Sequence, residues 1–145
     1  MRDSTTATIE GMGIKVVKVT KAYNSDLFNA AGLTDSAVIW QQPANTKLLN
    51  AKLVLDVKFV ATDMTDLDVT IGDAGDNDGI LAGAMNLVSD AANTQYKEEG
   101  AYLVSSPVLP QSAAKDWTAY ATAVGANLST LTAGQVSFYF AYIQR

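Results

Sequence analysis

Apolar and polar residues alternate along several segments of this chain, and a period of two is typical of a β-strand with one buried face. The alternation is clearest over residues 66–71 and recurs over residues 53–60. Residues 136–143 also alternate but are apolar on both faces, which predicts a central or covered strand. The apolar positions of these segments form the predicted core: Leu53, Leu55, Val57, Phe59, Leu67, Val69, Ile71, Val136, Phe138 and Phe140.

Other segments predict further strands because they are rich in β-branched or aromatic residues and end at turn residues. They are residues 14–20, 37–42, 102–104 and 117–124. Residues 72–79 predict an exposed turn, and residues 80–95 allow a couple of helical turns. One short helix is predicted over residues 26–31, with Ser25 as N-cap and Gly32 just past its end. About seven or eight strands in this arrangement predict an all-β antiparallel sandwich or barrel.

The N-terminal segment has a different pattern. Residues 1–13 are mostly polar and show no period of 2 or 3.6, so we predict an extended N-terminal arm over 1–13 and a single β-sandwich domain over 14–145. Ordering a backbone costs about 1–2 kcal/mol per residue, so the arm is expected to be mobile alone and to reach away from its own sandwich. Five arm residues form the predicted partner-binding segment, which would add a strand to a neighbouring subunit: Thr5, Thr6, Thr8, Ile9 and Met12.

Composition narrows the possible functions. The chain has 145 residues, the size of one domain, and contains no cysteine and no histidine. Disulfides, thiol nucleophiles and imidazole ligands or bases are therefore excluded. Only 17% of the residues are charged, which favours a surface in permanent contact with other subunits.

Charge and targeting patterns bear on location and partners. The net charge of −5 argues against nucleic acid as a partner, which requires clustered Lys and Arg. No segment approaches the roughly 20 apolar residues of a membrane span. The first six residues hold both charges and no apolar run follows, so no secretion signal is predicted and synthesis in a cytoplasm is expected.

The charges are unevenly distributed along the chain. Six of the lysines precede residue 59, whereas every charge from Asp63 to Asp90 is acidic. Two regions of opposite sign could guide head-to-tail or capsid contacts. A solvated surface of mixed charge is the alternative interpretation.

Two groups of aspartates are candidates for chemistry. Asp66 and Asp68 would place their Cα atoms roughly 6.5 Å apart on one strand face, within the range of glycosidase carboxylates; we favour a solvated strand face instead. The aspartates of residues 73–78 could offer oxygens to calcium, but the spacing fails, because Asp78 and Ala84 stand where an EF-hand needs Gly and Glu. A metal-free turn is therefore predicted.

The aromatic residues and the remaining motifs give no catalytic site. Trp40, Trp117 and the tyrosines could line a sugar-binding face, but core and rim positions of a sandwich are favoured. Serines without histidine lack their usual base, and residues 11–13 are not followed by the Gly-Lys-Ser/Thr of a phosphate loop. No cofactor, metal or catalytic residue is predicted, and the chain is expected not to be an enzyme.

Several segments resemble small jelly-roll structural proteins of tailed bacteriophages. They are residues 28–35 (FNAAGLTD), the alternating strand of residues 53–59, residues 67–81 (LDVTIGDAGDNDGIL) and the aromatic strand of residues 136–142 (VSFYFAY). The strand and turn of residues 67–81 are the most specific part. The resemblance covers residues 28–145 and includes capsid decoration (cement) proteins and other virion components.

The resemblance implies a jelly-roll sandwich and a structural role in a virion, made in the host cytoplasm. Our main hypothesis is a capsid decoration protein on the capsid surface that binds the major capsid protein, as a homotrimer at three-fold and quasi-three-fold positions. The alternative is a carbohydrate- or receptor-binding module of a phage head or tail fibre. A glycosidase that uses Asp66 and Asp68 is a third hypothesis.

Overall fold

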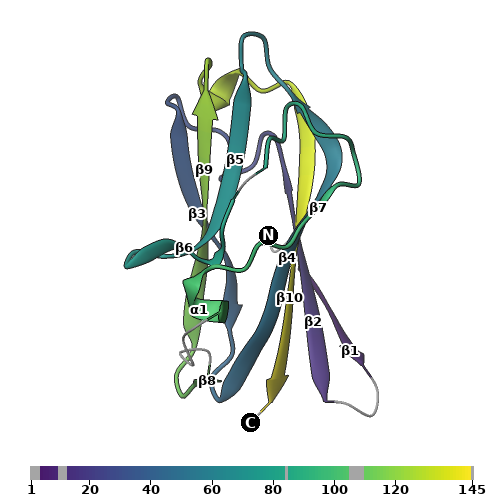
Figure 1. The fold of residues 1–145 in the computed structure, drawn as a ribbon, viewed down its shortest axis with the longest axis vertical. Coiled ribbons are helices and arrows are strands. Elements are labelled where there is room, and N and C mark those ends of the chain that lie inside the picture. The colour runs from purple at the N-terminus through teal and green to yellow at the C-terminus, as the bar shows by residue number, and fades with distance from the viewer. Residues whose placement is uncertain (1–3, 10–12, 84, 105–109, 145) are drawn as a thin grey trace.

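The computed structural model describes residues 4–9, 13–83, 85–104 and 110–144, with the backbone alone for residues 4–9, 110 and 111. Two antiparallel sheets pack face to face (Figure 1). Sheet A contains, in spatial order, β1 (Ser4–Ile9), β2 (Ile14–Ala22), β10 (Ala133–Gln144), β4 (Thr46–Val60) and β7 (Gln95–Tyr96), and β8 (Pro110–Gln111) pairs with the start of β4. Sheet B contains β3 (Thr34–Gln42), β9 (Lys115–Val124), β5 (Asp66–Asp73) and β6 (Asp76–Leu81).

The connections follow the jelly-roll pattern. From β2 to β5 the chain crosses between the sheets at every step, β5 and β6 form a hairpin within sheet B, and β9 and β10 again lie in opposite sheets. The first and last long strands, β2 and β10, pair with each other over nine residues. The predicted all-β jelly-roll-like sandwich is therefore confirmed. Among the described residues, no helix is long and apolar enough to span a membrane.

The predicted core is confirmed at nine of its ten positions, which are at most 1% exposed. The exception is Val57, whose side chain is 49% exposed. The register of β10 against β4 shifts between Gln135 and Val136, opposite Val57 and Leu55. This bulge breaks the alternation of β4, so Val57 lies outside the core while Phe59 returns to it.

The short helix predicted over residues 26–31 is wrong. The chain makes a turn there, in which the amide of Phe28 donates to the carbonyl of Ser25. Leu27 and Phe28 are both fully buried, and the Phe28 ring lies 4.8 Å from that of Phe59. Packing of this pair in the core overrides the local helix propensity of the segment.

Two further predictions around the turn of β5 and β6 need correction. The turn is confined to residues 74 and 75, and residues 76–81 form β6, whose end buries Ile80 and Leu81. The strand predicted over residues 102–104 is instead the single helical turn α1 (Ala101–Val104). Tyr102 leans over Gly79 and its hydroxyl donates to Asp73 at 3.0 Å, so a tertiary contact sets the local conformation.

The N-terminal segment does not reach away from its own sandwich as predicted. Residues 4–9 form β1, the edge strand of sheet A, paired with β2 from Ser4 opposite Val19 to Ile9 opposite Ile14. β2 lies between β10 and β1, so β1 is on the outer side of the sheet (Figure 1). The extended conformation expected from the threonines is present, but the partner strand belongs to the same chain.

Candidate interaction surfaces

The predicted partner-binding residues lie on a sheet edge. Thr5, Thr6, Thr8 and Ile9 all belong to β1, and Met12 lies outside the described residues. One side of β1 pairs with β2, and within the described part of the chain no strand pairs with its other side. An edge strand of this kind presents backbone N–H and C=O groups that a strand of another molecule can pair with.

The outer face of sheet A contains a tyrosine between two lysines. Tyr139 of β10 lies opposite Lys18 of β2 and Lys52 of β4. The ammonium groups of Lys18 and Lys52 lie 5.9 and 5.1 Å from the centre of the Tyr139 ring, within reach of a cation–π attraction. The charges of these lysines did not reveal this arrangement in the sequence, because the three residues are distant along the chain and meet only through strand register.

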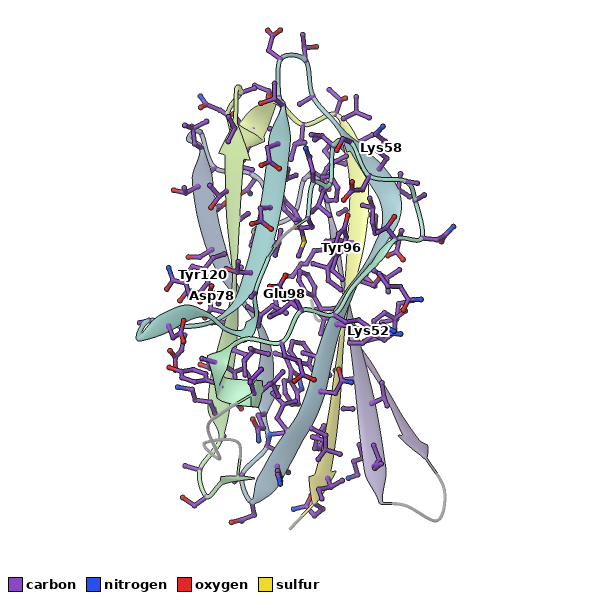
Figure 2. All side chains as sticks on the ribbon, viewed as in Figure 1. Lys52, Lys58, Asp78, Tyr96, Glu98 and Tyr120 are labelled. Atoms are coloured by element: carbon purple, nitrogen blue, oxygen red, sulfur yellow. The ribbon has the colours of Figure 1, made fainter. Side chains whose placement is uncertain are left out.

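A surface hollow of about 300 Å³ lies at Tyr139 and Lys52. Its polar rim includes Asn50, Lys52 and the exposed Lys97, and Val16, Phe140 and Ala141 complete the lining with Tyr139. Figure 2 shows Lys52 on the outer side of sheet A. A hollow of this composition fits a small group that combines negative charge with an apolar stem.

Asp66 and Asp68 lie on β5 with their side chains away from Leu67 and Val69 of the core. The solvated face expected for both does not hold for Asp68: a Cβ on Gly83 would come within 2.2 Å of its carboxylate, so the backbone at Gly83 covers it. Burial raises the pKa of Asp68, and repulsion from Asp66 adds to the rise. Neither Asp66 nor Asp68 lines either of the two surface hollows described in this structure.

Asp73 organises the turn between β5 and β6. Its Oδ1 accepts from the amides of Gly75 and Asp76 and from the hydroxyl of Tyr102, each at 3.0 Å, and its Oδ2 accepts from Lys115 Nζ at 2.9 Å. Burial alone would raise the pKa of Asp73, but the hydrogen bonds from Lys115 and Tyr102 lower it. Both oxygens are thus engaged within the chain. Within the described ranges, no group of three or more acidic residues could hold a metal ion, and a metal-free turn stays a prediction.

Asp68→Asn is expected to raise the free energy of unfolding at pH 7, by less than about 1 kcal/mol because water still reaches the side chain. Because the folded pKa is raised, the penalty of the charged form is full above that pKa and disappears below the ordinary value of 3.8. The advantage of the variant over the wild type should therefore vanish in acid. Denaturant melts at pH 7 and about pH 3 measure both values.

Asp73→Asn is the matched control, and it should change the free energy of unfolding in the opposite direction to Asp68→Asn. The lowered pKa of Asp73 means that its contribution is present above the ordinary pKa and is lost as the pH falls through the folded pKa. The free energy of unfolding of this variant should be lower than that of the wild type by about 1–2 kcal/mol at pH 7, and by less in acid. An Asp68→Asn variant that is less stable than the wild type at pH 7 would show that the Asp68 charge stabilises the fold.

The tryptophans belong to the core, as favoured. Trp117 is 1% exposed, and its Nε1 donates to Gln42 Oε1 at 3.0 Å. Trp40 stacks on Phe140 with ring centres 4.6 Å apart.

Tyr120 instead lines a polar groove of about 480 Å³ on sheet B. The other residues of this groove are Thr34, Asp35, Ser36, Asn77, Ala121 and Thr122.

Comparison with known proteins identifies the fold. No family model and no curated protein sequence matches the chain. A chain of the cyanophage Pam1 capsid asymmetric unit superposes with a TM-score of 0.57 and 17% identity, over 96% of this chain and 91% of that one. A chain of the capsid of Ralstonia phage GP4 superposes with a TM-score of 0.51 and 18% identity, over 97% and 91% of the two chains. The chain therefore shares its jelly-roll fold, over nearly its whole length, with chains found in two bacteriophage capsids.

Proposed function

We propose that this chain is a non-enzymatic structural protein of a bacteriophage virion, and more specifically a capsid decoration protein that binds the major capsid protein and stabilises the shell. The observation that supports the proposal is the structural likeness to two capsid chains. The superposition covers 91% of each of these two chains.

Decoration requires contacts that cross subunit boundaries. A standard protein–protein interface buries about 1,600 Å², and any protein that binds only the assembled shell stabilises it by mass action. The free side of β1 is the proposed attachment edge, with Thr5, Thr6, Thr8 and Ile9 in the strand and Met12 beyond its end. A homotrimer at three-fold positions would present three such edges to the shell.

The test uses capsids of the phage that encodes the chain, assembled without it. The purified full-length protein should cosediment with these particles and raise the temperature at which they break open. Deleting residues 1–10 removes β1 and should weaken attachment at least about tenfold, since several strand hydrogen bonds are lost. Deleting residues 1–3 leaves β1 in place and serves as the control.

Two outcomes would count against the proposal. Full-length protein that does not bind the particles removes the decoration role. A 1–10 deletion that remains folded and binds with unchanged affinity leaves that role but moves the binding surface away from β1. Circular dichroism and a thermal melt of the deletion variant separate lost binding from lost structure, because removing β1 leaves β2 as the edge of sheet A.

Carbohydrate binding is the second candidate, and the groove beside Tyr120 is the observation that favours it. A half-buried aromatic ring with hydroxyl and amide groups around it is typical of a site for neutral sugars. Host surface polysaccharide added to the protein should then shift the Tyr120 resonance in an NMR titration. Unchanged spectra with saturating polysaccharide would remove this candidate.

A further inference from the structure

The two sheets of the sandwich carry opposite charges. The strands of sheet A contain six lysines and one aspartate: Lys15, Lys18, Lys21, Lys47, Lys52, Lys58 and Asp56. The strands of sheet B contain seven aspartates and one lysine: Asp35, Asp66, Asp68, Asp73, Asp76, Asp78, Asp116 and Lys115. The division along the sequence thus becomes a division between the two faces of the molecule.

Most lysines of sheet A form no ion pair with another described residue. The ion pairs among the described residues are Lys21 with Asp26 and Lys115 with Asp73. Asp56, the one acid on the strands of sheet A, accepts hydrogen bonds from Ser137 and Gln135. Lys18 and Lys52 are held against the Tyr139 ring, which reduces the side-chain entropy that they would lose in a complex.

The counterpart on sheet B is the β5–β6 hairpin, which projects from the side of the sandwich away from sheet A (Figure 1). Asp76 and Asp78 lie two residues apart on β6, and neither forms an ion pair with a described residue. The neighbouring side chain of Asp78 raises the pKa of Asp76. Two crowded carboxylates favour a cationic partner. Figure 2 shows Asp78 on the opposite side of the molecule from Lys52.

We propose that copies of this chain associate head to tail, with Asp76 and Asp78 of one copy seated at the lysine-rimmed hollow of sheet A on the next. The hollow of about 300 Å³ has room for two aspartate side chains, and Lys52, Lys97 and Asn50 in its lining supply hydrogen-bond donors. Because two different surfaces meet, the contact is heterologous: it closes into a ring when the rotation between neighbours allows and otherwise continues as a row. The opposite charges would also orient the copies as they approach.

Charge reversal tests this contact. Sedimentation velocity of the full chain at about 50 mM salt should show association that increases with protein concentration and weakens at about 500 mM salt, where the Debye length is much shorter. Lys52→Glu with Lys97→Glu should raise the dissociation constant at least about tenfold, because like charges then meet. Asp76→Lys with Asp78→Lys should do the same. In an equimolar mixture, opposite charges meet wherever the hairpin of one variant contacts the hollow of the other, so the mixture should associate again.

The control is Lys47→Glu with Lys58→Glu, which changes the net charge by the same amount on exposed β4 positions outside the hollow. This variant should associate like the wild type. The proposal is overturned by a wild-type chain that stays a single copy at low salt, by a mixture that does not associate, or by a control as weak as the Lys52 and Lys97 variant. Association in solution without attachment to capsids would remove the decoration role and leave this contact standing.

Discussion

Phe59→Ala is expected to lower the free energy of unfolding by about 3–5 kcal/mol, the usual cost of deleting a buried aromatic ring. The Phe59 side chain is 1% exposed and lies between two parts of the core. On one side its ring is 4.8 Å from that of Phe28, and on the other the backbone of Gly134 packs directly against it. These rigid neighbours cannot fill the space that the ring leaves, so most of the cavity should remain.

The matched control is Val57→Ala, two residues away on β4. Because Val57 is 49% exposed, this change should cost less than about 1 kcal/mol. Urea melts of the wild type and both variants give the comparison. Equal losses at the two positions would mean that the bulge beside Val57 is misplaced and that the strand alternates without interruption.

Strands with one buried face were predictable because the alternation of apolar and polar residues directly reflects which side chains are buried. β5 is the clearest example: Leu67, Val69 and Ile71 are fully buried, and the residues between them, Asp68 and Thr70, are not. The alternation could not predict the jelly-roll connectivity, since many sandwich topologies show the same alternation. The jelly roll was expected from the resemblance of residues 28–145 to phage proteins. The structure then supplied the strand order.

The elements that were missed depend on contacts between distant segments. Residues 76–79 have the composition of a turn, yet they continue into β6 because β5 offers a pairing edge and Ile80 and Leu81 are buried. The helical turn α1 follows from the hydrogen bond of Tyr102 to Asp73, 29 positions earlier in the chain. Neither contact can be predicted from the conformational preferences of the local sequence.

The candidate surfaces show the same limit. The sequence indicated a division of charge and an extended N-terminal segment, and both features are present. It did not indicate that Lys18, Lys52 and Tyr139 form one row, because that follows from the registers of β10 with β2 and β4. It also predicted that Thr5, Thr6, Thr8 and Ile9 would pair with a neighbouring subunit, since a polar strand without an apolar face gives no sign of which edge it will pair with.

Gly134→Ala is expected to lower the free energy of unfolding by about 2–5 kcal/mol, as the sum of backbone strain and overpacking. Gly134 has a φ of +136°, a conformation that residues with a Cβ rarely adopt. A Cβ at this position would also lie 2.4 Å from the Phe59 ring. Gly32→Ala is the control, since a Cβ at Gly32 meets no atom within 4 Å, and it should change stability by no more than about 0.5 kcal/mol.

Combining Gly134→Ala with Phe59→Ala separates the two causes. Removing the ring relieves the clash but not the backbone strain, so the double variant should lose less than the sum of the single losses, by about 1–3 kcal/mol. Strictly additive losses would assign the whole effect of Gly134→Ala to the backbone conformation. A Gly134→Ala variant as stable as the wild type would mean that β10 shifts at this position, and the register of Gln135 against Val57, which sets the bulge in β4, would then have to change with it.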